Sequence, residues 1–258
     1  MSFNFVDYQG ECEQHGPFTG RIMTGLKSEI RSGCPVCSEE KRIEREAEEA
    51  EQRRKDAEES RKRYIAGKLK SAAIPPRFQG KSFSDYVADT DKQAKALAVC
   101  TEYAESFDSH YDAGRCLLLM GKPGCGKTHL AAAIAAYLCE NTRYFAVYRT
   151  LPGLIQEIRA TYGQDSEQSE ADILHAVTSC ALLVLDEIGA TKSSEFELSL
   201  LFNVINTRYE QKLPTLIVSN LAPAELGSAI GDRCVDRLRE GGGIVVAFDW
   251  ESRRRQIK

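Results

Sequence analysis

A glycine-rich segment at residues 121–128 combines backbone freedom with a cation and a hydroxyl group. It reads GKPGCGKT. Gly126, Lys127 and Thr128 are consecutive, and Gly121 lies five residues before Gly126. Glycines let the backbone turn its N–H groups inward around an anion, and the lysine adds a positive charge. The hydroxyl of Thr128 suits a magnesium ion. This spacing is typical of a loop that cradles nucleotide phosphates.

The residues on either side of this segment supply the elements that such a loop requires. An apolar run precedes it and an Ala-rich stretch follows it, so the order is strand, loop and helix. The positive end of the helix dipole then faces the phosphates. We expect ATP and Mg²⁺ here, with Lys127 reaching the β- and γ-phosphates and Thr128 ligating the metal. The expected nucleotide-binding residues are Gly121, Lys122, Pro123, Gly124, Cys125, Gly126, Lys127, Thr128 and His129.

Two adjacent carboxylates end a second apolar run, CALLVLDEIG. They are Asp186 and Glu187, and they fall at the carboxyl end of the expected strand, where parallel sheets bind ligands. Asp186 would hold Mg²⁺ directly or through water. Glu187 would orient and deprotonate an attacking water. The pair therefore predicts ATP hydrolysis rather than binding alone.

Two later positions extend the candidate catalytic set. Asn220 ends the run TLIVSN, where its amide could hydrogen-bond the γ-phosphate or the lytic water. Arg233 and Arg237 lie one turn apart in GDRCVDRLREG, and such a pair can present guanidinium groups toward phosphate. Surface ion pairs with Asp232 and Asp236 explain the two arginines equally well on spacing alone.

A second group of residues near the start of the chain could bind a metal. Cys12 and His15 form one pair, and Cys34 and Cys37 form another after an eighteen-residue gap. This is the spacing of a structural zinc site in which imidazole replaces one thiolate. Zinc binding is worth about 10 to 16 kcal/mol in small finger peptides, which is ample for a segment too short to fold alone. Few basic residues separate the pairs, which favours protein docking over DNA binding: Arg21, Lys27 and Arg31.

The elements that position these groups fall into three segments. Residues 1–37 are polar and Gly-rich without a long helical or strand period, which suits a small zinc-binding module. Residues 38–73 are mostly charged or alanine and predict a long helix, either a solvated connector or a docking surface for a partner. Pro75 and Pro76 should end it. Its supporting pairs at i,i+4 spacing are Glu49/Arg53, Glu51/Lys55, Glu58/Lys62 and Glu59/Arg63.

From residue 74 to residue 258 apolar runs alternate with amphipathic stretches. Continuous apolar runs are typical of parallel strands that are covered on both faces. The pattern predicts a three-layer α/β domain with a five-stranded parallel sheet. The expected strands are Cys116–Met120, Tyr144–Arg149, Ala181–Leu185, Thr215–Ser219 and Ile244–Phe248, and the expected helices span 91–109, 127–140, 151–162, 169–179, 194–211 and 232–239.

Composition narrows the class of protein further. The chain has 258 residues, of which 42% are hydrophobic, enough for a substantial core. Its net charge of −4 excludes a general polyanion binder, so nucleic-acid contact would need a local basic patch. One candidate is the tail Arg253, Arg254, Arg255 and Lys258, although a solvated chain end explains it as well. Without a run of about 20 apolar residues or a leader-like start, we expect a cytoplasmic protein and no membrane partner.

Residues 74–258 resemble the helicase-loader branch of the AAA+ ATPases, the DnaC-type replicative helicase loaders and their phage relatives, and are similar to the IstB-like transposition helper ATPases. The resemblance rests on IPPRFQGKSFSDY, GKPGCGKTHLAAAI, LLVLDEIG, GDRCVDRLREGG and FDWESRRRQI. It implies that Asn220 is the first sensor and Arg237 the second arginine sensor. It also implies that Arg233 is an arginine finger entering a neighbouring subunit, a device worth about 10³ to 10⁵ in rate elsewhere. Self-association follows from such a finger.

The resemblance implies an ATP-dependent loader that binds a hexameric DnaB-type helicase through residues 1–70 and places it on single-stranded DNA. It also implies no helical lid after the sheet. Arg159 and Tyr162 would lie along the DNA path. The zinc module is outside the resemblance. A transposition helper ATPase and a nucleotide-gated adaptor with little hydrolysis remain alternatives, whereas a small-molecule kinase lacks any recognisable acceptor-binding region.

Overall fold

The computed structural model describes residues 4–24, 29–163, 168–189 and 194–252. The chain divides into two compact units, Met1–Tyr64 and Ile65–Lys258, and the boundary falls within the helix α1, Pro35–Ala72. No helix in the described ranges is long and apolar enough to cross a membrane. Three predictions fall outside these residues. They concern Lys27, the basic tail of Arg253, Arg254, Arg255 and Lys258, and the absence of a lid after the sheet, which would involve the chain beyond Ser252.

The first unit contains a β-hairpin that the sequence did not predict. β1 (Asn4–Cys12) and β2 (Gly16–Thr24) pair antiparallel in an unbroken register, and the two-residue β3 (Ile30–Arg31) joins β2. The expectation of no long strand period over residues 1–37 is therefore wrong. Gly20 is the only buried residue of the two strands and the others are exposed or half-buried, so neither face demands the alternation of apolar and polar residues that reveals a strand in sequence.

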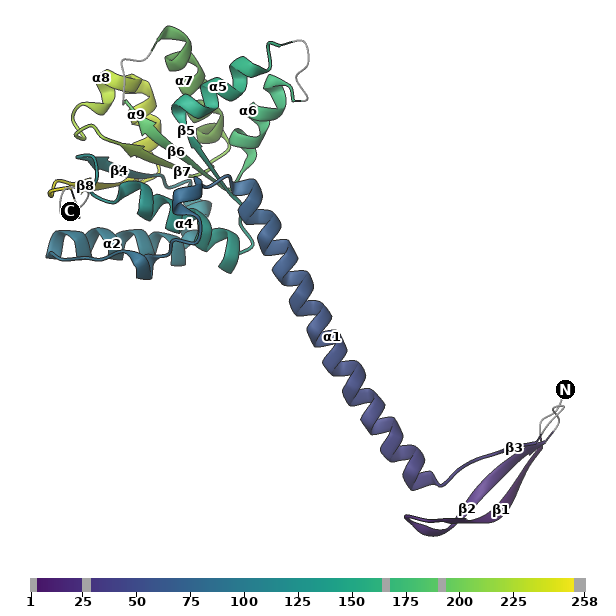
Figure 1. Cartoon of the computed structure of the whole chain (residues 1–258). Coiled ribbons are helices and arrows are strands. Elements are labelled where there is room, and N and C mark those ends of the chain that lie inside the picture. The colour runs from purple at the N-terminus through teal and green to yellow at the C-terminus, as the bar shows by residue number, and fades with distance from the viewer. Residues whose placement is uncertain (1–3, 25–28, 164–167, 190–193, 253–258) are drawn as a thin grey trace. The chain divides into compact units, whose positions relative to one another are not determined.

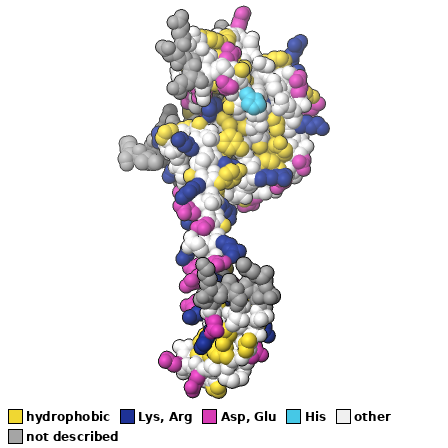
Figure 2. All heavy atoms as spheres, turned by 90° about the vertical axis from the view of Figure 1, so that its right-hand side faces the viewer, with side chains coloured by type: hydrophobic (Ala, Val, Ile, Leu, Met, Phe, Trp, Pro, Cys, Tyr) yellow, Lys and Arg dark blue, Asp and Glu magenta, His cyan; other side chains and the backbone are white. Residues whose placement is uncertain are grey.

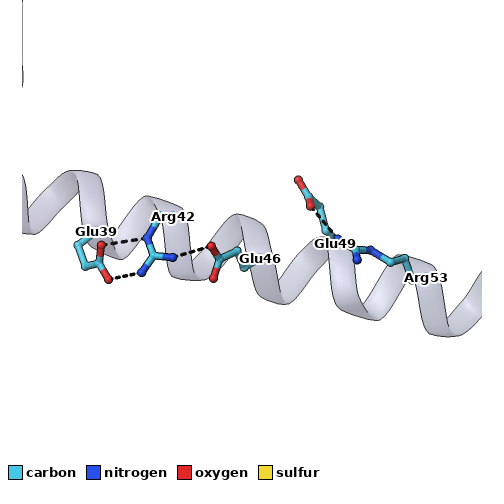
Figure 3. A network of polar contacts seen from close by, with 5 residues as sticks. All are labelled: Glu39, Arg42, Glu46, Glu49 and Arg53. Carbon is cyan, nitrogen blue, oxygen red and sulfur yellow. Dashed lines mark hydrogen bonds and ion pairs between the residues drawn. The ribbon is translucent and has the colours of Figure 1, made fainter.

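α1 is a long helix whose side chains from residue 38 to residue 64 are all exposed. The four expected i,i+4 ion pairs are present, and Figure 3 shows one of them, Glu49–Arg53, next to Arg42, which bridges Glu39 and Glu46. Figure 2 shows acidic and basic side chains mixed along this stretch. The helix ends at residue 72, shortly before Pro75 and Pro76, as expected.

The second unit is built on a five-stranded parallel sheet with the strand order β5-β6-β7-β4-β8, which confirms the predicted fold class (Figure 1). In β4, Leu117 and Leu119 enter one core while Leu118 and Met120 enter the other. This double burial is why the strands read as continuous apolar runs. The strands are β4 (Leu117–Gly121), β5 (Ala146–Thr150), β6 (Leu182–Ile188), β7 (Thr215–Ser219) and β8 (Ile244–Phe248).

Helices cover both faces of this sheet. One core is closed by α2 (Asp91–Glu105), α3 (Phe107–Ala113) and α4 (Lys127–Asn141), and short 3₁₀ helices at Pro76–Phe78 and Phe83–Asp85 precede them. The other core is closed by α5 (Leu151–Ala160), α6 (Glu170–Ser179), α7 (Glu195–Glu210), α8 (Leu226–Ile230) and α9 (Asp232–Arg239). The three-layer arrangement thus places the carboxyl ends of β4, β6 and β7 together at one edge.

Among the helices predicted after residue 74, two differ from the structure by more than one residue at an end, and one α-helix was not predicted. The helix expected over 91–109 breaks at Ser106, and the break lets Phe107 pack against Tyr103 with ring centroids 5.9 Å apart. The helix expected over 151–162 ends at residue 160. α8 was not expected, because five residues are too few for a helical period to show.

One guanidinium group lies wholly inside the second unit. Arg208 of α7 has no exposed surface, and burial lowers its pKa from the usual value. Among the described residues it donates to the Cys180 sulfur (3.4 Å) and to neutral oxygen acceptors, and not to a carboxylate. The oxygen acceptors are the Thr215 hydroxyl (3.0 Å) and the carbonyls of Val177 (3.0 Å), Cys180 (2.9 Å), Ala181 (3.5 Å) and Pro214 (2.5 Å).

Candidate nucleotide and metal sites

The glycine-rich loop joins the end of β4 to the start of α4. Gly126 precedes the helix with a φ of 94°, and Gly124 has a φ of 79°, a region that favours glycine. A Cβ atom at Gly126 would lie 2.5 Å from the Tyr86 ring, and one at Gly124 would lie 2.0 Å from the Ser252 hydroxyl oxygen. Both the conformation and the space around the loop therefore require glycine.

The loop opens on a cavity of about 220 Å³. The predicted residues Lys127, Thr128, Asp186, Glu187 and Asn220 all line it, as does the predicted His129, because the loop and the ends of β6 and β7 meet at this edge of the sheet. Arg77 and Phe78 also line it, although no site role was predicted for them beyond their place in IPPRF. The structure thus gathers the predicted groups from three separate stretches of chain.

Lys127 is held at the base of the loop. Its side chain is 4% exposed, and its ammonium group donates to the carbonyls of Gly121 and Lys122 at 2.7 Å each. The backbone carbonyls of the loop therefore position the lysine charge beside the N-terminus of α4. Gly121, Lys122 and Cys125, which were also predicted to bind nucleotide, do not line the cavity, whereas the predicted Pro123 does.

Cys125 instead faces the C-terminal segment. Its thiol lies 2.9 Å from the Trp250 carbonyl, and the Trp250 indole N–H donates to the Cys125 carbonyl at 3.2 Å. The Tyr86 hydroxyl donates to the same carbonyl at 3.3 Å. The Lys122 amide donates to the Phe248 carbonyl at 3.0 Å. Hydrogen bonds with Tyr86, Phe248 and Trp250 thus hold the loop in place. In the sequence no site role was predicted for these residues beyond their place in the motifs that carry the family resemblance.

Asp186 lies at the cavity with both carboxylate oxygens hydrogen-bonded. One accepts from the Glu187 backbone N–H at 2.6 Å, and the other accepts from the hydroxyl of Tyr148 on β5. Tyr148 is 1% exposed, and its burial, reinforced by the Asp186 charge, raises its pKa well above the usual range. The phenol is therefore a neutral donor at physiological pH. The sequence reasoning missed Tyr148, although a hydroxyl-bearing residue within the apolar run FAVYRT was a signal.

Glu187 owes its direction to an irregularity in β6. The pairing of β6 with β7 shifts register between Leu185 and Ile188, and Glu187 has a φ of 63°. A bulge of this kind redirects a side chain, and here it leaves the carboxylate exposed at the cavity while the neighbouring side chains are buried. The bulge therefore separates the two acidic residues, one held inside and one offered to the cavity.

The residues at this cavity fit a nucleoside triphosphate with its magnesium ion. A helix N-terminus, a glycine loop and Lys127 form an anion-binding arrangement. The Thr128 hydroxyl and the Asp186 carboxylate supply the hard oxygen donors that Mg²⁺ prefers. When bound, the metal would neutralise charge on the phosphates. Glu187 and Asn220 line the same cavity.

The two predicted arginines lie apart from this cavity on α9. Arg233 is exposed in a groove with Leu198 and Phe202. Arg237 stacks on the rings of Phe202 and Tyr209, at 4.9 and 5.5 Å from their centroids, and lines a different cavity of about 410 Å³. Among the described residues neither arginine forms an ion pair with a carboxylate. The alternative explanation by local ion pairs is therefore not supported.

The predicted DNA-contacting residues are both exposed. Arg159 lies in the last turn of α5, and Tyr162 follows the helix end with 64% of its surface exposed. The Tyr162 hydroxyl donates to Glu170 at 3.2 Å. Both side chains are open to solvent, and neither belongs to the core.

The four predicted zinc ligands come together at the closed end of the hairpin and the start of α1. Their ligand atoms all lie within 4.8 Å of one another. The Cys12 and Cys37 sulfurs are 3.5 Å apart, and His15 Nδ1 lies 3.2 Å from Cys37 and 3.8 Å from both Cys12 and Cys34. Ligands about 2.0 to 2.3 Å from a tetrahedral zinc ion would be separated by similar distances. The cluster could therefore form a zinc site.

The electrostatics of the cluster also favour a cation. Backbone N–H groups of Gln14 and His15 lower the pKa of the Cys12 thiol to about 6, whereas the pKa of Cys37 is raised mainly by the neighbouring Cys12 sulfur. Crowded sulfurs resist sharing negative charge unless a cation lies between them. The other nitrogen of His15 lies 3.3 Å from Glu40, a carboxylate placed to orient the imidazole.

Comparison with known proteins reveals relatives over most of the chain. The family model described as IstB-like ATP binding protein matches residues 41–256. The replicative helicase loader DnaC of Buchnera aphidicola subsp. Acyrthosiphon pisum is 32% identical over 190 residues, which cover 74% of this chain and 76% of that protein. DnaC of Escherichia coli K12 is 31% identical over 186 residues, which cover 72% and 74% of the respective chains.

Solved structures share the fold of the second unit. A crystal structure of the DnaC helicase loader aligns with a TM-score of 0.60 at 23% identity, covering 67% of this chain and 99% of that chain. AMPPCP-bound DnaA from Aquifex aeolicus aligns with a TM-score of 0.56 at 21% identity, covering 71% of this chain and 53% of that chain. The three-layer sheet architecture is thus common to this chain and to both of these proteins.

Proposed function

Since the chain belongs to the family of IstB-like ATP-binding proteins, in the DnaC-like branch of the AAA+ ATPases, we propose that it is an ATP-dependent helicase loader. It would place a hexameric DnaB-type replicative helicase on single-stranded DNA in the cytoplasm. The observation that carries this proposal is the identity of about 30% to replicative helicase loaders over roughly three quarters of both chains. The cavity at the glycine-rich loop supports it, because it gathers the residues that ATP turnover requires.

The proposed ATPase reaction assigns a role to each group at the cavity. Lys127 would draw the phosphates against the N-terminus of α4, and Thr128 with Asp186 would hold Mg²⁺. Glu187, whose carboxylate the bulge exposes, would take a proton from the attacking water. Asn220, at the end of β7, would orient that water or the γ-phosphate. These are the hydrolytic roles expected from the sequence, and the geometry supports them.

We further propose that the site is completed by a neighbouring subunit. Arg233 is exposed on α9 and does not line the cavity of its own chain, which suits a finger that acts on the next subunit. Arg237 would have to leave the rings of Phe202 and Tyr209 to reach a phosphate, so its sensor role also requires assembly. Arg159 and Tyr162, both exposed, would contact DNA.

The remaining parts of the chain would connect the ATPase to its partner. We propose a zinc module at residues 1–37, a helical connector at 38–73 and the ATPase domain at 74–258. The module presents exposed apolar side chains on its strands, Phe5 at 63%, Val6 at 55% and Ile30 at 51%. Exposed apolar groups of this size are suited to contact with a protein. The helicase would therefore be the ligand of this module.

A second candidate function is a transposition helper ATPase. It is favoured by the description of the matching family model, which names IstB rather than a helicase loader. The two functions share the nucleotide site and differ in the protein that the chain delivers to DNA. A nucleotide-gated adaptor with little hydrolysis would differ from both in its turnover.

The proposed function is tested by separating partner capture from ATP turnover. The full chain is immobilised and offered a hexameric DnaB-type helicase, single-stranded DNA and ATP. We expect the wild type to capture the helicase and transfer it to DNA. Glu187→Gln and Arg233→Ala should each keep capture but lose turnover by about 10³-fold. Cys34→Ser with Cys37→Ser should keep turnover and lose capture.

Mixing variants checks the contribution of the neighbouring subunit. We expect Glu187→Gln and Arg233→Ala each to be inactive alone. In a mixed assembly, an Arg233→Ala subunit supplies an intact Glu187 and a neighbouring Glu187→Gln subunit supplies an intact Arg233. ATP turnover should therefore return in part. Capture of a transposase but not of the helicase would favour the second candidate. Wild-type turnover that Arg233→Ala leaves unchanged would contradict a trans-acting finger.

A further inference from the structure

We propose that Tyr148 is a positioning residue for the magnesium ligands of the nucleotide site. This inference rests on the proposed ATPase function and assigns to β5 a part in metal binding. Tyr148 does not line the cavity and would not touch nucleotide. It would act through Thr128 and Asp186, the two residues placed to hold the metal.

The first step is the position of the phenol between strands. β5 and β6 pair in parallel, with Tyr148 opposite Val184 and Thr150 opposite Asp186, so the tyrosine lies two residues before the register position of the carboxylate. Its hydroxyl donates to one Asp186 oxygen, while the Glu187 amide donates to the other at 2.6 Å. With both oxygens held, the carboxylate plane cannot rotate freely.

The second step is that Thr128 belongs to the same chain of hydroxyl groups. The Thr128 side chain is a hydrogen-bonding neighbour of the Tyr148 hydroxyl. Because the phenol donates its proton to Asp186, its oxygen can only accept from Thr128. The hydrogen bonds therefore run in one direction: Thr128 donates to Tyr148, and Tyr148 donates to Asp186. The threonine proton then points to the phenol, and the Thr128 lone pairs remain for a metal.

The third step is the cost of removing the hydroxyl. Asp186 is only 5% exposed, so water cannot readily replace the lost donor. Without the phenol, Thr128 could turn its proton toward the metal and Asp186 could rotate. Loss of the hydrogen-bond partners that orient metal ligands typically costs 10- to 100-fold in metal affinity. A phenol that merely satisfied a core position would not affect metal affinity.

The experiment measures how Mg²⁺ strengthens nucleotide binding in the full chain. The affinity for the fluorescent analogue mant-ADP is determined over a range of free Mg²⁺ and in EDTA. For Tyr148→Phe we expect the Mg²⁺ concentration at half effect to rise 10- to 100-fold, with the affinity in EDTA unchanged. The matched control is Tyr144→Phe, which loses a 2.6 Å bond to Asp108 at the other end of the strand and should leave both affinities unchanged.

Two results would overturn the inference: an unchanged Mg²⁺ dependence in Tyr148→Phe, or a tighter one, which would mean that the phenol competes with the metal. A wild type that binds nucleotide without any Mg²⁺ dependence, or not at all, would instead count against the proposed function. Asp186→Asn supplies an independent check. Adding Tyr148→Phe to it should cause a smaller loss of Mg²⁺ dependence than in the wild type, because only the action through Thr128 remains, and a further full loss would contradict action through Asp186.

Discussion

Glu187 combines a proposed catalytic role with a backbone conformation that glutamate rarely adopts. Its φ of 63° lies in the left-handed region, where the Cβ atom of an L-residue crowds the following carbonyl at a cost of about 1 to 2 kcal/mol. The same conformation lets the Glu187 amide donate to Asp186 and leaves the Glu187 carboxylate exposed at the cavity. The strain therefore accompanies the arrangement that separates the two acidic groups.

Substitution at this position should reveal the strain. Glycine tolerates a positive φ, so Glu187→Gly should be about 1 kcal/mol more stable than Glu187→Ala, although glycine in an ordinary strand is less stable than alanine. Hydrogen exchange of the β6 amides, compared at equal denaturant, measures the difference. Both variants lack the carboxylate and should lose ATP turnover alike. Equal stabilities, or a less stable glycine variant, would show that the bulge carries no strain.

At the scale of elements, Arg208 joins parts of the second unit that the sequence separates. It extends from α7 and binds carbonyls after α6 and before β7, as well as the first hydroxyl of β7. Its neutral partners satisfy the guanidinium donors, while burial lowers its pKa. This one side chain therefore sets the spacing at the amino ends of β6 and β7, the strands that carry Asp186 and Asn220 at their other ends.

Replacing this arginine should destabilise the second unit strongly. Arg208→Met keeps much of the side-chain volume but leaves several buried carbonyls without donors, at about 1 to 3 kcal/mol for each group that water cannot reach. We expect a loss of at least about 3 kcal/mol, seen as a fall of about 6 °C or more in the thermal midpoint. Arg143→Met removes a guanidinium that is 79% exposed and should shift the midpoint little.

How well the sequence predicted an element depends on how much of that element is buried in an apolar core. β7, which is buried on both faces, and β8, an edge strand exposed at Val245 and Ala247, could be placed to the residue because every side chain in them is apolar or small. The hairpin β1–β2 could not, since Gly20 is its only buried residue and neither face belongs to an apolar core. Tyr148 and Arg208 were missed for a related reason: a polar side chain in a core is explained only by partners that the fold brings to it.

At the scale of the whole molecule, the chain consists of two units, and a different interaction stabilises the fold of each. The second unit has two apolar cores around its sheet. In the first unit Gly20 is the only buried residue of β1 and β2, and Cys34 is the only one of the four cluster residues that is buried. A unit with so little buried surface depends on another source of stability, and the cysteine and histidine cluster is suited to supply it.

Removal of zinc should therefore unfold one unit and leave the other intact. In the presence of a strong chelator we expect the β1 and β2 amides to lose hydrogen-exchange protection, whereas those of β4 to β8 keep it and nucleotide affinity is unchanged. Cys34→Ser should give the same result without chelator. Acidification should weaken zinc binding, because the thiolates and the imidazole must be deprotonated to bind. Persistent protection of the hairpin in the chelated protein would contradict the prediction.

The contact between Trp250 and the glycine-rich loop has a consequence for how the loop can be observed. Trp250 is the single tryptophan of the chain, and its indole donates to the Cys125 carbonyl within the loop. Indole emission depends on hydrogen bonding and on local polarity. Any rearrangement of the loop around phosphates thus changes the surroundings of the one strong natural fluorophore. The protein carries its own optical reporter, one hydrogen bond away from the glycine-rich loop.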